Sequence, residues 1–543
     1  MTSRDVFAAV GRTRAILAIL LGGAALRLYA LGRESFWIDE LYSISDALGN
    51  TTIELLTELP VVKNHTPAYY VFLRQWERLT GITEVGLRLP AVLAGVGTIY
   101  VVYLVGTRLF DPRRGAIAAG LVALSRYHIA HSQEVRMYAF VGLLTGISFY
   151  WLVELNETYT RRSLAGYLLT TALLVYTHPY GVFVILGQNV YVWARLAVSA
   201  DLAHDVRRWL SVQTGLGVLL VPYGVIVVRK LAATVGGGSV PLDWRTPPDL
   251  ATIIGTPIGH AGYPVIPVTY EGVPVHLVSL AIGIPIVYGV LGVAVLRRTG
   301  ASGDAIIRGL GFRRENREGV YLCAAWLAVP ILAPAVVSHL LTPIYGLRYT
   351  IGASLALFLL LAHGVTRIER RHLRYGVAGL LVLFLVVPVP VHYAIPTNEQ
   401  WRESIDYVTE NAEDDDLVVF PNADTTNAWE IYAPNATLTV REVDSEERWQ
   451  ELNGTLREHE TIWVLNRTFA QSVEHRPAQV VLNDTHRMTD EKSYYGVDVY
   501  RFDRRANVTN VSSVIHPDVI WLSRAVTNPG YHEPNALIWC RGA

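Results

Sequence analysis

Long hydrophobic stretches return along most of the chain and are separated by polar connections. Each approaches the length of about 20 residues that a helix needs to cross a hydrocarbon layer of roughly 30 Å. The pattern therefore predicts eleven membrane-spanning helices. Their ranges are 13–31, 87–109, 115–131, 137–153, 164–178, 181–198, 209–228, 276–296, 320–341, 349–365 and 375–394.

The composition favours a membrane protein that carries a water-soluble tail. Hydrophobic residues make up 51% of the 543 residues, and the mean hydropathy of +0.29 is too high for an ordinary soluble protein. The net charge of −1 conceals an asymmetry, because the segment from Thr397 onward carries 25 acidic and 13 basic side chains. We predict a membrane domain over residues 1–396 and a soluble domain over residues 397–543, and we expect no nucleic-acid partner.

Arginines orient the predicted helices. They gather in every second connection, which the positive-inside rule assigns to the cytoplasm. These connections hold Arg12, Arg14, Arg113, Arg114, Arg161, Arg162, Arg207, Arg208, a basic run over 297–317, Arg367, Arg370, Arg371 and Arg374. An odd number of spans then leaves the N-terminus inside and the tail outside. Asn-x-Ser/Thr sequons cluster in the tail and agree with its export.

Two long connections, residues 32–86 and 229–275, also lie outside in this topology, and long loops are usually functional. The first contains amphipathic stretches that favour helices lying along the membrane surface. They cover residues 41–47, 53–59 and 68–79. The tail has the pattern of a small α/β domain. Its predicted helix covers residues 401–412, and its predicted strands lie within 416–421, 461–467 and 495–504.

Charged residues near the predicted outer surface are the candidates for chemistry. Asp39 and Glu40 follow the first span, and Glu134 follows the third. A charge so close to the bilayer is costly and usually functional. Arg136 and Arg348 also need an explanation, because outer segments carry few arginines, and a planar guanidinium group is well suited to bind phosphate.

Five segments carry a family resemblance through their order and spacing. They are ESFWIDELYSISDA, HTPAYY, RLPAVLAGVGTIYVVYLVGTRLF, SRYHIAHSQEVRMYAF and PIYGLRYTIGASLALFLLLA. Over about residues 10–365 the chain resembles the multi-spanning, polyprenyl-phosphate-dependent (C-type) glycosyltransferases. The likeness is to the group that contains the lipid A aminoarabinose transferases and the protein O-mannosyltransferases, and the acidic tail favours an archaeal member.

The resemblance implies an α-helical polytopic enzyme that transfers a sugar from a polyprenyl (dolichyl) phosphate to a hydroxyl acceptor, with inversion, outside the cell membrane. Asp39 matches the family's catalytic base, while Glu40 supports it or contacts the acceptor. Arg136 and Arg348 match positions that hold the donor phosphate. Further substrate contacts are expected from His65, Tyr138 and Tyr345. The expected partners are the lipid-linked donor, a glycan, protein or lipid acceptor, and membrane lipids.

Other interpretations stay open for each of these residues. Asp39 and Glu40 could cap an interfacial helix, since acidic side chains favour helix N-termini. Glu134 could bind the sugar, position the acceptor, or pair with Arg136 or Arg126. The outer arginines could reach from the membrane to its surface. The whole chain could instead be a transporter of lipid-linked sugars, or an anchor for a tail that binds or senses a ligand.

Metal dependence is a separate question. His128 and His131 stand three residues apart, beside Glu134, so all three could lie on one helical face. No spacing is diagnostic of a metal site. We assign no metal ligand and no certain cofactor, although a divalent cation is compatible with the family.

Overall fold

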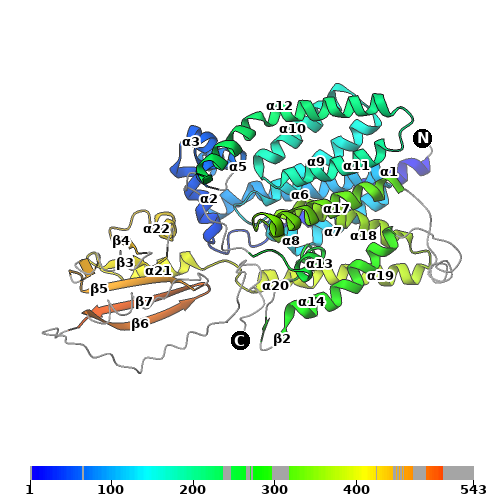
Figure 1. Ribbon diagram of the computed structural model, residues 1–543. Coiled ribbons are helices and arrows are strands. Elements are labelled where there is room, and N and C mark those ends of the chain that lie inside the picture. Colours follow the sequence, from blue (N-terminus) through cyan, green and yellow to red (C-terminus); the bar gives the residue numbers. More distant parts are fainter. Residues whose placement is uncertain are drawn as a thin grey trace.

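The computed structural model describes residues 3–63, 66–235, 246–264, 269–270, 273–295, 317–422, 425–443, 448, 452, 455–456, 458–468 and 485–505. The chain forms a bundle of long helices and a small sheet domain beside one end of it (Figure 1). His65 and much of the second long connection lie outside the described residues.

The bundle is built from helices that follow the hydrophobic blocks. Its first members are α1 (Ser3–Leu28), α6 (Glu84–Leu109), α7 (Pro112–Leu124), α8 (Arg126–Ala130), α9 (Tyr138–Glu157), α10 (Arg161–Thr177), α11 (Gly181–Leu196) and α12 (Leu202–Val235). The later members are α13 (Leu250–Gly259), α14 (Val275–Gly283), η1 (Ile284–Tyr288), α15 (Gly289–Val295), α17 (Arg317–Leu340), η2 (Leu347–Thr350), α18 (Ile351–Arg367), α19 (Arg371–Val386) and α20 (Pro388–Ala394). A two-stranded ribbon, β1 (Thr269–Tyr270) with β2 (Val273–Pro274), precedes α14.

Among the residues that the structure describes, seven helical stretches are long and apolar enough to cross a membrane, and they coincide with seven of the predicted spans. This agrees with a multi-pass membrane protein. The other four predicted spans fall on α1, α7, α10 and α11, so the total of eleven and the orientation stay predictions. The predicted span 115–131 is broken, because the helix ends at Leu124 and Ser125 caps the new helix α8 by accepting from the His128 backbone N–H.

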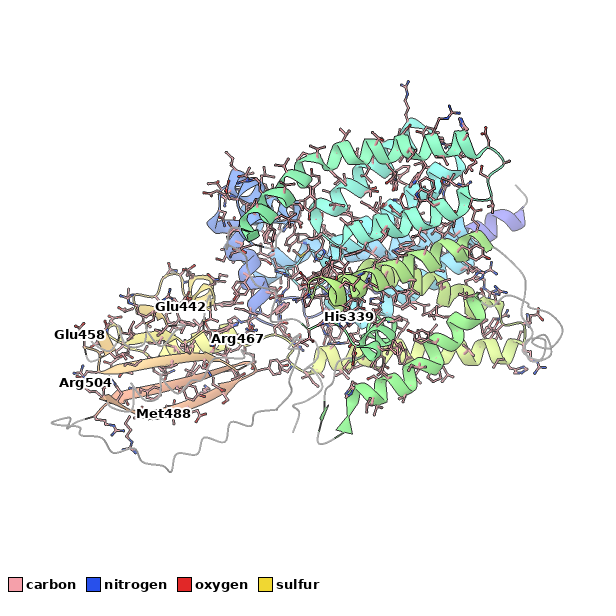
Figure 2. The ribbon with its side chains drawn as sticks, in the orientation of Figure 1. His339, Glu442, Glu458, Arg467, Met488 and Arg504 are labelled. Atoms are coloured by element: carbon pink, nitrogen blue, oxygen red, sulfur yellow. The ribbon has the colours of Figure 1, made fainter. Side chains whose placement is uncertain are left out.

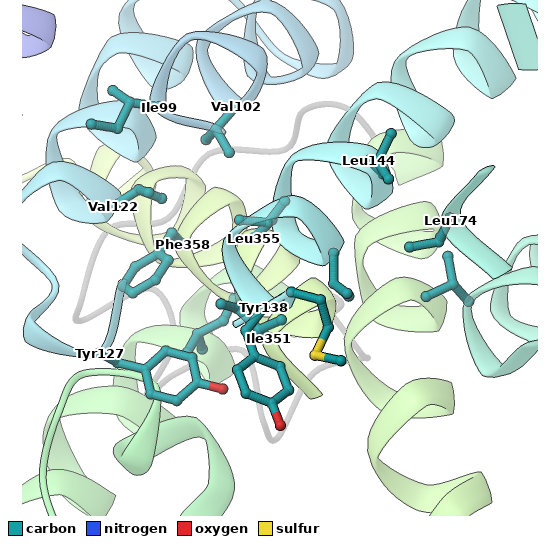
Figure 3. Packing of buried hydrophobic residues seen from close by; sticks show 14 of the residues in the cluster. Ile99, Val102, Val122, Tyr127, Tyr138, Leu144, Leu174, Ile351, Leu355 and Phe358 are labelled. Atoms are coloured by element: carbon teal, nitrogen blue, oxygen red, sulfur yellow. The ribbon is translucent and has the colours of Figure 1, made fainter. Parts of the chain in front are cut away.

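Helix α18 lies at the centre of the bundle and α12 at its edge. In the 18-residue apolar stretch of Leu347–Arg367, which includes most of α18, 89% of the residues are buried inside the protein. In the corresponding stretch of α12 the share is 6%. Leu355 and Phe358 of α18 pack among side chains of other helices, including Val102, Val122 and Leu144 (Figure 3). Such a helix can hold residues near its ends in fixed positions, and η2 joins α18 at its N-terminal end.

Close helix contacts are made possible by small residues. A methyl group added to Gly106 of α6 would lie 2.7 Å from the Cα of Gly115 in α7, so only glycine fits at this crossing. Arg27 in α1 is buried, and it has no acidic partner among the residues that the structure describes. Its guanidinium donates to the hydroxyl of Ser132 over 3.1 Å and to a set of main-chain carbonyls. These belong to Gly23, Val122 and Ala123.

The first long connection folds into short helices, as its amphipathic stretches predicted. They are α2 (Ile38–Gly49), α3 (Thr52–Thr57), α4 (Leu59–Val62) and α5 (Pro67–Thr80). Leu41 and Ile44 of α2 and Tyr70 of α5 are buried, whereas Ile53 of α3 is exposed. These helices gather at the end of the bundle that faces the sheet domain (Figure 1).

The tail forms the predicted α/β domain over the part that the structure describes. It contains α21 (Trp401–Asn411), β3 (Leu417–Phe420), α22 (Thr426–Tyr432), β4 (Thr439–Glu442), β5 (Thr461–Arg467), β6 (His486–Tyr494) and β7 (Val497–Arg504). The strand order is β4-β3-β5-β7-β6, with β3 parallel to β4 and β5, and with β7 antiparallel to β5 and β6. Alternate residues face opposite sides, so Val418 and Phe420 pack with Trp401 of α21, while Leu417 and Val419 pack on the other face.

The sheet domain meets the bundle through residues of α21 and α22. The main-chain N–H of Phe36 donates to the hydroxyl of Tyr432 over 2.7 Å, and the Ser45 hydroxyl donates to Asn427 over 3.2 Å. Arg402 forms an ion pair with Glu84 at 2.7 Å. The sheet domain is therefore attached to the first long connection through specific polar contacts.

Candidate active site

Helix α2 carries the candidate base at its N-terminal end. Asp39 is the second residue of the helix and Glu40 the third. The Glu40 carboxylate turns back and accepts from the main-chain N–H of Trp37 over 3.2 Å, which satisfies a donor left free at the helix start. The Asp39 carboxylate does not take part in this cap, and 20% of its side-chain surface is exposed. The two neighbouring carboxylates therefore lie in different environments.

Two arginines hold Asp39. Arg348, from η2, donates from Nη1 to Oδ2 over 2.7 Å, and Nη2 of Arg136 lies 4.0 Å from the same oxygen. Arg136 also donates to the Asp39 carbonyl over 3.0 Å and to the Ser43 hydroxyl over 2.8 Å. Burial opposes the ionisation of Asp39, but the charges of Arg348, Arg136 and Arg467 outweigh it and hold the pKa of Asp39 below its ordinary value. Asp39 is therefore an ionised carboxylate at neutral pH.

Aromatic rings surround the Asp39–arginine cluster. The Arg348 guanidinium carbon lies 5.9 Å from the Trp37 ring centre and 5.7 Å from those of both Tyr138 and Tyr349. The His178 ring centre lies 5.0 Å from that of Tyr349. Tyr138 comes from the first residue of α9, close to Ile351 of α18 (Figure 3). Cations and aromatic faces together suit a ligand that carries both an anionic group and a sugar ring.

Glu40 is held more completely than Asp39. It forms a buried ion pair with Arg88, with Nη2 to Oε2 at 2.7 Å and Nε to Oε1 at 2.9 Å. The main-chain N–H of Val135 donates to Oε1 over 2.7 Å. Burial raises the pKa of Glu40, and Arg88 offsets only part of this. Because both of its oxygens are engaged, Glu40 suits the supporting role better than contact with an acceptor.

Glu134 is paired with a histidine, not with either of the two arginines considered as its partners. Its Oε1 lies 2.6 Å from Nδ1 of His131, so the structure pairs it with this histidine instead of Arg136 or Arg126. The reason is local, because the short helix α8 ends at Ala130 and the next turn brings residues three apart together. Glu134 also lines a cavity that is bounded by Trp37 and His392.

Tyr345 and His65 are the two remaining predicted contacts. Tyr345 is buried, and its hydroxyl lies 2.5 Å from that of Thr256 in a packing group with Ile331 and Ala335. Its predicted role in substrate contact stays a prediction. His65 lies outside the described residues, so its role stays a prediction.

The structure gives the metal question no positive answer. Nε2 of His128 lies 2.7 Å from the Ser354 hydroxyl, and His131 is engaged by Glu134. Among the residues that the structure describes, no group of three or more His, Cys, Asp and Glu side chains could hold a metal ion.

Several residues of the cluster were not singled out by sequence reasoning. His178 is the last residue of the predicted span 164–178, and the polar run THPY at that point was the signal that could have revealed it. Trp37 was visible only as part of the Trp-Ile-Asp-Glu motif. Ser43 and Arg467 had no local signal, because one is an ordinary residue of α2 and the other lies far along the chain in β5.

Part of this cluster lies in a segment that matches a known protein family. Residues 64–222 match the family model for dolichyl-phosphate-mannose-protein mannosyltransferase. The match confirms the resemblance to polyprenyl-phosphate-dependent glycosyltransferases, and it includes Glu134, Arg136 and Tyr138. Asp39 and Arg348 lie outside the matched range. No curated protein matches the chain.

Several solved structures are similar to the chain at low sequence identity. ArnT from Cupriavidus metallidurans bound to undecaprenyl phosphate has a TM-score of 0.46 at 13% identity, covering 91% of this chain and 98% of its own. The oligosaccharyltransferase AglB from Archaeoglobus fulgidus, in complex with an inhibitory peptide and a dolichol-phosphate, has a TM-score of 0.47 at 13% identity, covering 91% and 74%. Mycobacterial arabinofuranosyltransferase AftD has a TM-score of 0.46 at 14% identity, covering 89% and 41%.

Proposed function

We propose that the protein is a glycosyltransferase that moves a sugar from a polyprenyl phosphate to a hydroxyl acceptor. The observation that carries the proposal is the Asp39 carboxylate, partly exposed at the start of α2 and held by Arg348 at 2.7 Å and Arg136 at 4.0 Å. A base beside two phosphate-binding cations is what this reaction needs. The family match over residues 64–222 supports the same class of donor.

The reaction is one displacement at the anomeric carbon. The acceptor oxygen forms a bond to this carbon as the bond to the phosphate oxygen breaks, which inverts the configuration. Asp39 takes the acceptor proton, and polyprenyl phosphate leaves with the bonding electrons. Proton transfer to a positioned carboxylate contributes about 10²–10⁴-fold to such rates.

Arg348 and Arg136 stabilise the departing phosphate, whose negative charge grows as the bond breaks. Arg348 can donate to either Asp39 or a phosphate oxygen. When a phosphate draws Arg348 away, Asp39 loses a cation that lowers its pKa, and it becomes a stronger base. Donor binding would thereby prepare the base for the acceptor.

The aromatic rings of Trp37, Tyr138 and Tyr349 provide faces against which a sugar can pack. Glu134 and His131 form a second polar pair, and we assign them to positioning the sugar or the acceptor. His65, from the family resemblance, is a further candidate for contact with the phosphate.

We place the reaction at the outer face of the cell membrane, because the arginine-rich connections favour α2 and the tail lying outside. The acidic tail with its sequons favours a dolichyl phosphate as carrier and a surface glycan as acceptor. A protein hydroxyl and a membrane lipid are the alternative acceptors.

The test is sugar transfer by purified protein in lipid vesicles, with radiolabelled dolichyl-phosphate mannose and other dolichyl-phosphate sugars as donors. We expect Asp39→Asn to lower kcat at least about 100-fold. Asp46→Asn removes another carboxylate from α2 and serves as the matched control, with activity near wild type. Loss in Glu134→Gln with an active Asp39→Asn would move the base to Glu134. A wild-type protein that consumes none of these donors contradicts the proposal, and transport of lipid-linked sugar would be measured next.

A further inference from the structure

A buried carboxylate from the soluble domain lies directly at the start of the catalytic helix. Glu399 precedes α21, and its side chain is only 2% exposed. Its Oε2 accepts from the main-chain N–H of Ile38 over 2.8 Å and from the Trp401 indole over 3.1 Å. Its Oε1 accepts from Nε of Arg467 over 2.5 Å. Both oxygens are therefore engaged, and one of them holds the residue next to Asp39.

Ile38 is the first residue of α2. The first N–H groups of a helix have no partner within it, and they carry the positive end of the helix dipole. A carboxylate placed there fixes the helix start and gains from that charge. Since Asp39 follows Ile38, the position of Glu399 limits how the Asp39 main chain can move.

Arg467 links Glu399 to the sheet. It is the last residue of β5, and its main-chain N–H donates to Asn422 over 2.9 Å, just after β3. Its side chain lies on the side of the sheet domain that faces the bundle (Figure 2). The ends of two parallel strands thus hold the arginine, the arginine holds Glu399, and Glu399 holds α2.

We propose that Glu399 and Arg467 are positioning residues through which the soluble domain holds the base Asp39 in place for sugar transfer. The inference rests on the proposed function, because it concerns the same carboxylate. It gives the tail a part in catalysis that is independent of whether the tail also recognises an acceptor.

Other contacts between the domain and the bundle provide a matched control. Arg402 in α21 forms an ion pair with Glu84 at 2.7 Å and donates to the Arg33 carbonyl over 2.7 Å. These contacts join the same two parts but do not reach the start of α2. Arg402→Gln therefore weakens the interface without removing the support beneath Asp39.

The experiment compares Glu399→Ala, Glu399→Gln, Arg467→Gln and Arg402→Gln in full-length protein in vesicles. Two quantities are measured: kcat and KM for dolichyl-phosphate mannose, and hydrogen exchange of the peptide over residues 35–45. We expect Glu399→Ala to lower kcat roughly 10- to 100-fold with little change in KM, because a small displacement of a catalytic group has effects of this size. Glu399→Gln should recover most of the loss, since its amide oxygen can still accept from Ile38.

Arg467→Gln has a further signature. The charged groups around Asp39 are Arg348, Arg136, Arg467 and Glu399. Loss of the Arg467 charge should move the acid limb of the pH–rate profile to higher pH, in the direction expected when a cation near a carboxylate is removed. A purely structural role for Arg467 would lower the rate without moving this limb.

The proposal is overturned if Glu399→Ala and Arg402→Gln reduce kcat equally, or if exchange over residues 35–45 is unchanged in Glu399→Ala. Exchange is measured without substrate, so it still decides whether Glu399 holds α2 if the wild type transfers no sugar. If the wild type transfers no sugar, the proposed function fails. Faster exchange over residues 35–45 in Glu399→Ala, but not in Arg402→Gln, would still show that Glu399 holds the start of α2.

Discussion

The buried pair between Arg88 and Glu40 allows a quantitative test of how α2 is held. The side chains are 2% and 0% exposed, and their two hydrogen bonds measure 2.7 and 2.9 Å. Arg88→Met would leave Glu40 buried with only main-chain donors, from Val135 and Trp37. It would also remove the donor from a set of carbonyls. These belong to Leu31, Glu34 and Ser35.

Removing one partner of a buried ion pair costs about 3–5 kcal/mol, because the other charge stays desolvated. We expect Arg88→Met to destabilise the protein by this amount. Arg88→Met with Glu40→Gln should cost less than the sum of the single changes, by roughly 1–3 kcal/mol, since no buried charge remains. Thermal unfolding in detergent, followed by tryptophan fluorescence, measures both effects as shifts of Tm by several degrees.

The pH dependence has a definite sign. Burial already raises the pKa of Glu40 in the folded protein, and loss of Arg88 raises it further. In Arg88→Met the folded state binds a proton that the unfolded chain has released. The free energy of unfolding of the variant therefore rises as the pH falls through this raised pKa toward the value of the unfolded chain, and its difference from wild type narrows. A glutamine at position 40 cannot bind this proton. In the double variant Arg88→Met with Glu40→Gln, the difference in stability from wild type should therefore not narrow as the pH falls.

Arg108→Met is the matched control. The side chains of Arg108 and of its partners Glu154 and Glu157 are 32%, 22% and 51% exposed, and pairs that solvent reaches contribute at most about 1 kcal/mol. The reasoning fails if Arg88→Met shifts Tm no more than Arg108→Met, or if Glu40→Gln gives no relief in the double variant.

Two further outcomes follow from the geometry. Arg348→Gln removes the cation nearest to Asp39, so the pKa of Asp39 rises and the acid limb of kcat/KM against pH should move to higher pH; an unmoved limb would mean that Asp39 is not the titrating base. Gly95→Ala would put a methyl group 2.1 Å from the Ser132 hydroxyl and should destabilise by about 1–3 kcal/mol in thermal unfolding, whereas Gly376→Ala meets nothing within 4 Å and should leave Tm unchanged or slightly higher.

Hydrophobic periodicity was sufficient to predict the long helices, because a run of apolar residues has few alternatives in a membrane. The predicted span over 115–131 was wrong in its length for a local reason. The run Ser125, Arg126, Tyr127 and His128 contains a capping hydroxyl and a charge, and the helix restarts there instead of continuing. A capping residue acts over only a few positions. Hydropathy averaged over the length of a membrane span therefore does not reveal the break.

Asp39 and Arg348 lie 309 residues apart in the chain, yet the structure joins them. Only the family resemblance linked them beforehand, since no local pattern relates a loop residue to the start of a distant helix. The partner of Glu40 was not predicted for the same reason. Tyr345 was expected to contact the substrate as an aromatic residue of the cavity. Its hydroxyl lies 2.5 Å from that of Thr256 in a packing group with Ile331 and Ala335, and its contact with substrate stays a prediction.

Three carboxylates meet the start of α2, and each has its own arginine from a different part of the chain. Arg88 of α6 holds Glu40, Arg467 of β5 holds Glu399, and Arg348 of η2 holds Asp39. The exposed fractions of these carboxylates are 0%, 2% and 20%.

A carboxylate whose oxygens are buried and shared with main-chain donors cannot exchange its partner without leaving those donors unsatisfied. Glu40 and Glu399 are in this position, so they suit the task of holding the helix. Asp39 retains exposed surface and an arginine that a phosphate could also bind. All three side chains are carboxylates that pair with an arginine. Solvent access is therefore what separates Asp39, the candidate base, from the two carboxylates that hold the helix.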